Sequence, residues 1–109
     1  MMKASQPSVP TKLREMLKAY PDYLEQFQQL LCEVANEPVA APRLELAIWA
    51  LEGRASRLLV EARAEREMAK QAGDPDRIAI ADQKEVLMGR VVIQKPWLGD
   101  MDFVDYFKE

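Results

Sequence analysis

Acidic side chains on two predicted helices are the residues whose types and spacing could support catalysis. Glu61 and Glu65 lie one helical turn apart on the first helix, and Asp82 and Glu85 lie one turn apart on the second. Four carboxylates held by a helical hairpin could bind Mg²⁺, as in some all-helical nucleotide hydrolases. The spacing differs between the two pairs, and arginines and lysines surround both. We therefore interpret these acids as parts of solvated, ion-paired helix faces.

Other catalytic groups are missing from the chain. It has no histidine, which removes the usual general base and the commonest transition-metal ligand. The single Cys32 excludes a zinc cluster and an intramolecular disulfide, and we expect it to be a buried or half-buried apolar residue. The four glycines are too scattered to form a phosphate-binding loop. We predict a protein that is not an enzyme.

Three acids near the C-terminus, Asp100, Asp102 and Asp105, have a superficial likeness to a calcium-binding loop. The central glycine and the terminal bidentate glutamate of such a loop are both missing. The sequence therefore predicts no catalytic residue, no metal site and no cofactor.

The sequence predicts a small all-α bundle built on a long antiparallel helical hairpin, with a short C-terminal aromatic tail; composition supports the helical class. Of the 109 residues, 49% are apolar and 30% are charged, as in globular proteins, and strong helix formers dominate. The net charge of −3 argues against nucleic acid as a partner. No stretch matches a signal peptide or the roughly 20 apolar residues of a membrane span, so we expect a cytoplasmic protein with no membrane contact.

Proline, glycine and capping signals divide the chain. We predict a flexible arm over residues 1–11, a helical domain over 12–95, and an acidic-aromatic tail over 96–109 that packs on the bundle or on a partner. Thr11 is the expected cap of the first helix, and "NEPVAAPR" is expected to be a stiff extended connection. The predicted helices cover residues 12–19, 21–36, 43–72 and 75–91, with a last turn capped by Asp100 and ending at Phe107.

The stretch "GDPD" predicts the turn of the hairpin. Gly73 can end one helix in the left-handed conformation, while Asp74 caps the next helix and Pro75 occupies its first position. The helix before this turn carries a heptad seam typical of a coiled coil, interrupted only by Glu65. Its members are Leu44, Ile48, Leu51, Ala55, Leu58, Ala62, Ala69 and Ala72.

The length of this helix leads to a homodimer hypothesis. Residues 43–72 would extend roughly 45 Å as a helix, whereas a compact chain of this size has a diameter of about 30–35 Å. The seam around Leu44 and Leu51 must then be covered by the helix over 21–36, by another chain, or by both. We expect a homodimer.

Two features of the surface are left open by the sequence. Gly53 is either a tolerated exposed glycine or, beside Trp49 and Ser56, a notch that accepts an aromatic side chain of the tail or of a partner. The aromatic residues of the tail either fold back onto the bundle, over the Trp49–Gly53 row, or dock into a groove of another protein.

These patterns favour a protein–protein interaction or assembly module that acts through helix faces with an unknown partner. The expected interaction residues are Leu44, Ile48, Trp49, Leu51, Gly53, Trp97, Phe103, Tyr106 and Phe107. The overall character of the sequence resembles that of small bacterial and prophage accessory, adaptor or inhibitor proteins. The alternatives are a nucleic-acid-associated accessory protein, through the basic residues of the long helix, and then the Mg²⁺-dependent nucleotide hydrolase.

Overall fold

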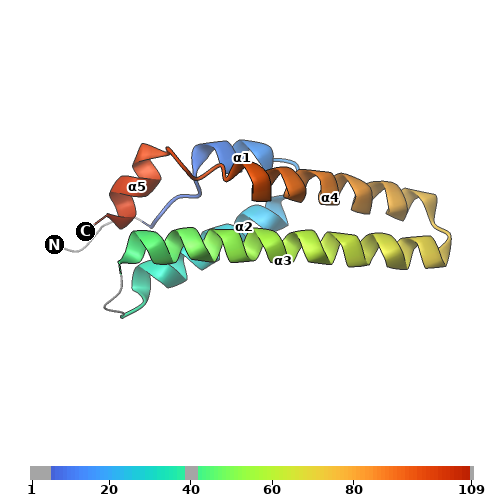
Figure 1. The fold of residues 1–109 in the computed structure, drawn as a ribbon, viewed down its shortest axis with the longest axis horizontal. Helices are drawn as coiled ribbons and strands as arrows, with labels where there is room; N and C mark the ends of the chain where they lie inside the picture. Colours follow the sequence, from blue (N-terminus) through green and yellow to red (C-terminus); the bar gives the residue numbers. More distant parts are fainter. Residues whose placement is uncertain (1–5, 39–41, 109) are drawn as a thin grey trace. The chain divides into compact units, whose positions relative to one another are not determined.

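Helices alone make up the regular structure of the part of the chain that the computed structural model describes, residues 6–38 and 42–108. In order along the sequence they are α1 (Thr11–Met16), α2 (Pro21–Asn36), α3 (Arg43–Ala72), α4 (Pro75–Gln94) and α5 (Met101–Phe107) (Figure 1). Within those two ranges there is no strand. The predicted all-α fold is confirmed.

Prolines mark the starts of α2 and α4. Pro21 and Pro75 occupy the first turns of α2 and α4, where a missing backbone N–H costs nothing. The expected cap at Thr11 was wrong. Pro10 occupies the N-cap position with extended backbone, and Thr11 is the first residue of α1. The helix also ends at Met16, earlier than predicted, and residues 17–19 form a turn ahead of Tyr20.

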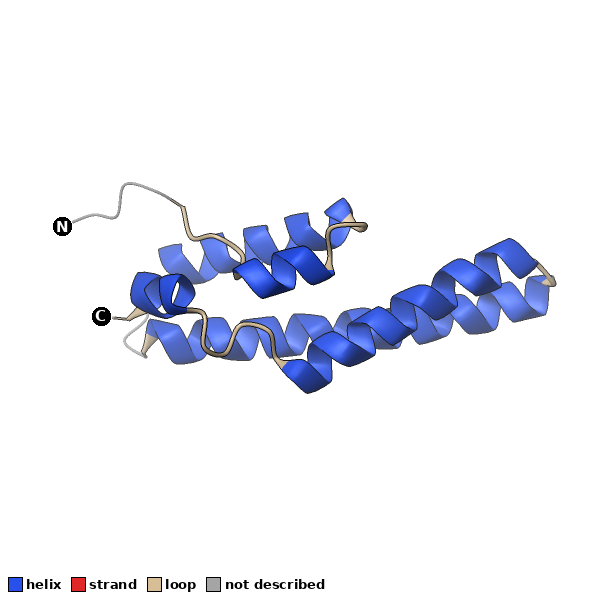
Figure 2. Cartoon of the chain, turned by 90° about the horizontal axis from the view of Figure 1, so that it is seen from above, coloured by secondary structure: helices blue, strands red, loops and turns tan. Residues whose placement is uncertain are grey.

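The turn between α3 and α4 matches its prediction residue by residue. Gly73 has a φ of 67°, which is the left-handed conformation that glycine adopts without strain. A carboxylate oxygen of Asp74 accepts a hydrogen bond from the backbone N–H of Arg77 at 3.2 Å. The two helices then run antiparallel, side by side, from this turn (Figure 2). The helical hairpin is confirmed. Its second helix continues to Gln94. The next residue, Lys95, takes a left-handed conformation ahead of Pro96.

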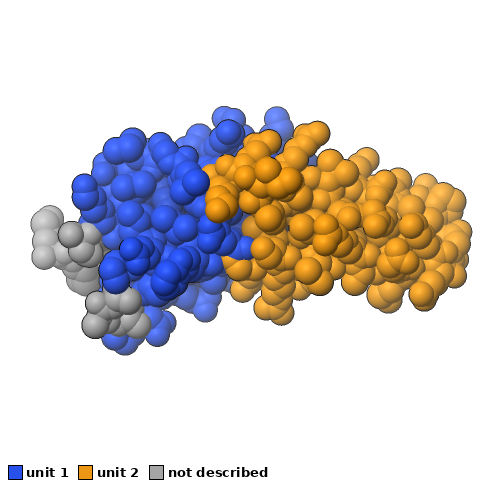
Figure 3. Space-filling model, viewed as in Figure 1, with its two compact units in different colours: residues 1–52, 96–109 blue, residues 53–95 orange. Residues whose placement is uncertain are grey.

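The chain divides into two compact units, each described here by itself (Figure 3). Unit 1 comprises residues 1–52 and 96–109, and unit 2 comprises residues 53–95. The boundary falls inside α3, and the tail over residues 96–109 is part of the unit that contains the start of the chain. The division into a helical domain over residues 12–95 and a tail that packs on the bundle or on a partner stays a prediction.

Unit 1 has a core of large side chains drawn from every one of its segments. Its buried apolar residues are Val9, Leu13, Leu17, Tyr23, Phe27, Leu31, Ala47, Leu51, Trp97, Phe103 and Phe107. The guanidinium of Arg43 donates hydrogen bonds to the carbonyl oxygens of Val34 and Ala35 at 2.9 and 3.1 Å. These bonds tie the start of α3 to the last turn of α2.

The predicted arm and the predicted stiff connection lie partly outside the described residues, at 1–5 and 39–41. In the described part of the arm, Pro7, Val9 and Pro10 are buried. The side-chain amide of Gln28 also donates to the carbonyl oxygen of Pro7 at 2.5 Å. Residues 7–10 therefore pack against α2 as part of unit 1.

Unit 2 has a core made mainly of small side chains. Its buried residues are Ala55, Leu58, Ala62 and Ala69 from α3, and Ala81, Met88 and Val91 from α4. The predicted seam is buried from Leu51 through Ala69, with Glu65 exposed as expected, whereas Ala72 is exposed. Nearer the start of α3, Ala47 is buried, while Leu44 and Ile48 are only partly buried. The alanines allow the two helices to approach closely.

Candidate functional site

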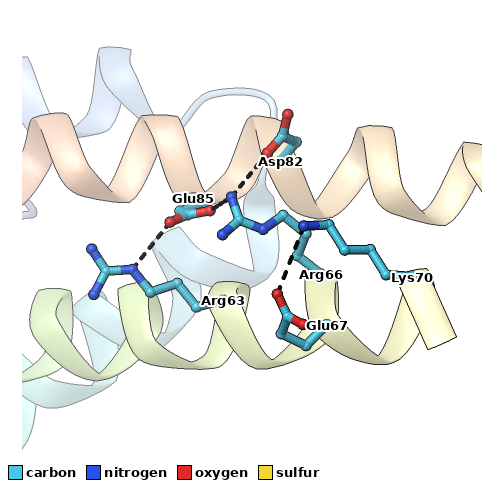
Figure 4. Close-up of polar contacts among 6 residues, drawn as sticks. All are labelled: Arg63, Arg66, Glu67, Lys70, Asp82 and Glu85. Atoms are coloured by element: carbon cyan, nitrogen blue, oxygen red, sulfur yellow. Dashed lines mark hydrogen bonds and ion pairs between the residues drawn. The ribbon is translucent and has the colours of Figure 1, made fainter.

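The acids that could have held a metal ion are engaged with basic side chains of unit 2. Nε of Arg63 lies 3.1 Å from an oxygen of Glu85, and Nζ of Lys84 lies 3.3 Å from an oxygen of Glu65. Both pairs link α3 to α4, and the first is visible in Figure 4. Within α3, Arg57 and Glu61 pair at 3.2 Å. The prediction of ion-paired helix faces is confirmed at these positions.

Arg66 lies at the centre of the ion pairs between the two helices (Figure 4). Its guanidinium contacts Glu85 and also lies 3.2 Å from Oδ1 of Asp82. The hydrogen bond to Asp82 raises the pKa of Arg66 above its ordinary value and outweighs the opposing effect of desolvation, and the negative charge of Glu85 raises the pKa further. Arg66 is therefore charged at neutral pH. Its contacts join α3 to α4.

A metal site would need several acidic, histidine or cysteine side chains close together. The described residues contain no group of three or more such side chains that could hold a metal ion. Arginine and lysine side chains pair with Glu61, Glu65, Asp82 and Glu85, and the pairs between α3 and α4 link the two helices of the hairpin.

Asp100 holds two segments of unit 1 together. One of its carboxylate oxygens accepts from the backbone N–H of Phe103 at 3.0 Å and caps α5, as predicted. The other accepts from the backbone N–H of Thr11, 89 positions earlier, at 2.9 Å. Both oxygens therefore have structural roles. Cys32 is half-buried beside Gln28, in accord with its prediction as a partly buried small residue.

The tail aromatics fold back into the core of unit 1. Trp97 has no exposed surface, and Phe103 and Phe107 are 3% and 2% exposed. The ring centroids of Phe103 and Phe107 lie 5.4 Å apart, and those of Tyr106 and Phe107 lie 5.1 Å apart. Leu98 differs from its aromatic neighbours in being 58% exposed.

The tail does not pack over the Trp49–Gly53 row, which is one of the two arrangements that the sequence left open. Trp49 is 63% exposed, and no heavy atom of the described chain beyond the local helix lies within 4 Å of a Cβ built on Gly53. The tail finds larger apolar partners in unit 1, which explains the difference. The binding of a partner's aromatic side chain in the notch at Gly53 stays a prediction.

The predicted interaction residues fall into three groups by exposure. Leu51, Trp97, Phe103 and Phe107 are buried; Leu44, Ile48 and Tyr106 are partly buried; Trp49 and Gly53 are exposed. The four buried residues cannot contact a partner while unit 1 is folded. The homodimer hypothesis depended on a seam around Leu44 and Leu51 that needed a cover. Because the chain itself buries Leu51, this seam no longer supports the hypothesis.

Sequence reasoning missed the outer face of α4. The exposed residues there follow an alternating four–three spacing and are Ala79, Gln83, Val86, Arg90 and Ile93. The same spacing is present in the sequence, but a second apolar line of α4 runs through Ala81 and Met88, and this second line is the buried face.

Across residues 6–38 and 42–108, none of the helices combines the length and the apolar character that a membrane span requires. Comparisons of this chain with family models, with curated proteins and with solved structures found no match. A function must therefore be argued from the side chains alone.

Proposed function

We propose that this chain is a protein–protein interaction or assembly module that forms a homodimer through the outer helix faces of unit 2. The observation that supports the proposal is the distribution of apolar side chains in the hairpin. Four of its seven buried residues are alanines, whereas its large apolar residues include five that are 52–82% exposed. The exposed set consists of Val60 and Met68 on α3 and Ile80, Val86 and Ile93 on α4.

Burial of these side chains would stabilise a complex. Removing one such side chain fully from water contributes about 1.5–3 kcal/mol. Unit 2 consists of two helical segments, and its own fold leaves their outer faces uncovered. A second helical surface is the natural cover, because aliphatic side chains at helical spacing pack well against another helix.

The alternative functions receive less support. Arg57, Arg63, Arg66 and Lys70 all have acidic partners, which weakens the nucleic-acid alternative. The same ion pairs occupy the acids that a Mg²⁺-dependent hydrolase would need. A cytoplasmic location and a role as an accessory, adaptor or inhibitor protein belong to the proposal.

Light scattering of the full chain at rising concentration tests the proposal. The molar mass should rise from 12.5 kDa toward that of a dimer as the concentration approaches about 1 mM, the upper range for weak association. A variant with glutamate at all five exposed apolar positions of unit 2 should stay monomeric and helical. A wild-type chain that remains at 12.5 kDa throughout would refute the homodimer.

A further inference from the structure

We infer that the outer face of α4 binds α4 of a second copy of this chain, antiparallel, with Val86 at the two-fold axis. The inference rests on the proposed function and specifies which face of unit 2 forms the contact and in which register. A two-fold axis requires one surface to complement itself, so the face of α4 must be self-complementary.

The outer face of α4 has the spacing of a helix-pairing seam. Ala79, Gln83, Val86, Arg90 and Ile93 alternate by four and three residues, and all five are exposed. Val86 is 55% exposed and Ile93 is 82% exposed. Val86 also lines an open groove of about 440 Å³ on this face.

The opposite face of the same helix carries Met88 and Val91, which are buried within the chain. The helix is therefore apolar on two sides, and its own hairpin covers one of them.

Side-chain size favours an antiparallel pair centred on Val86. In such a pair, positions equally far before and after Val86 face each other across the axis. Ala79 and Ile93 lie seven residues on either side of it, so the smallest side chain of the line faces the largest aliphatic one. The two valines meet at the centre. Each end of the contact then pairs a small residue with a large one, which allows close packing.

Charge favours the same register. Asp82 and Arg90 lie four residues on either side of Val86, so Arg90 would face Asp82 of the second copy. The Asp82 side chain is 59% exposed and binds Arg66 through Oδ1, which leaves its carboxylate accessible to a second cation. Arg90 has no ion-pair partner among the described residues. A parallel pair would instead place Arg90 against Arg90 in the seam, where like charges repel.

Substitution of two exposed valines, Val86 on α4 and Val60 on α3, tests whether the outer face of α4 forms the contact. Val86→Glu should weaken dimerisation of the full chain at least about tenfold, because two carboxylates would meet at the axis. Val60→Glu, on the outer face of α3 and 61% exposed, should leave the dissociation constant unchanged. An equimolar mixture of Val86→Glu and Val86→Lys chains should dimerise again, since the two variants place opposite charges at the axis. Light scattering measures the wild-type chain, the two single variants and the mixture, and circular dichroism verifies that each variant is helical.

Cysteine cross-linking tests the register in chains that also carry Cys32→Ala. Val86→Cys alone, and a mixture of Ala79→Cys with Ile93→Cys chains, should form disulfide-linked dimers. Ile93→Cys alone should not, because its two copies would lie roughly 20 Å apart along the helices. Efficient cross-linking of Ile93→Cys alone would indicate a parallel pair and overturn the register.

The two proposals fail in different ways. If Val86→Glu leaves the dimer intact, this inference is overturned but the proposed function is not. A chain that never dimerises would refute both.

Discussion

Two glycines of unit 2 show how one residue type has opposite effects on stability. Gly73 ends α3 with a φ of 67°, whereas Gly89 lies inside α4. A Cβ built on either residue meets no heavy atom of the described chain within 4 Å beyond the local helix. The two positions therefore differ in backbone conformation and not in available space.

Alanine at these two positions should consequently shift stability in opposite directions. Gly73→Ala should lower the free energy of unfolding by about 1 kcal/mol, because an L-residue is strained in the left-handed region. Gly89→Ala should raise it by roughly 0.5–1 kcal/mol through better helix propensity. Urea denaturation followed by circular dichroism measures both changes. The structural account of the turn fails if both variants move the midpoint in the same direction.

The residue types and their spacing in the sequence were enough to predict that Asp74 caps α4 and that the acids of the hairpin form ion pairs. The second hydrogen bond of Asp100 was beyond such reasoning. Its partner is the backbone N–H of Thr11, and 89 positions separate the two residues. Helix signals act over a few residues, so they can identify a cap without revealing which distant segment that cap also holds.

At the scale of the helical elements, small side chains set how closely α3 and α4 approach. Ala62 is fully buried between the helices, while Ala64, two residues later on the same helix, is exposed. Ala62→Leu should lower the free energy of unfolding by about 1–3 kcal/mol, because the larger side chain forces the helices apart. Ala64→Leu should change it by less than about 0.5 kcal/mol. Denaturation of the two variants in parallel decides the point, and equal effects would refute an alanine-mediated approach.

Helix bounds were more predictable than helix faces. The bounds of α2 and α3 follow from proline and glycine signals, and the structure reproduces them. The faces of α4 are harder to assign, because Ala81 and Met88 on one side and Ala79, Val86 and Ile93 on the other are both apolar at heptad spacing. Only the position of α3 determines which face is covered. The exposed line on α4 therefore emerged from the structure.

At the scale of the whole molecule, unit 1 is assembled from both ends of the described chain. Residues 96–108 contribute Trp97, Phe103 and Phe107 to a core that also contains Val9 and Leu13. Unit 2 is a continuous stretch of sequence. Damage to the tail should consequently destabilise unit 1 directly, whereas the hairpin depends mainly on its own local contacts.

Trp97→Ala tests this division. Loss of a fully buried tryptophan should cost about 3–5 kcal/mol, whereas Leu98→Ala, next to it and 58% exposed, should have little effect. In hydrogen exchange, the amides of α1 and α2 should lose protection in Trp97→Ala, because they belong to the damaged core. The amides of α4 between Ala81 and Met88 should keep most of theirs, since the hairpin retains its alanine seam and its ion pairs. An equal loss of protection in α4 would mean that the two units unfold as one, because α3 runs through both and can transmit the damage along its own backbone.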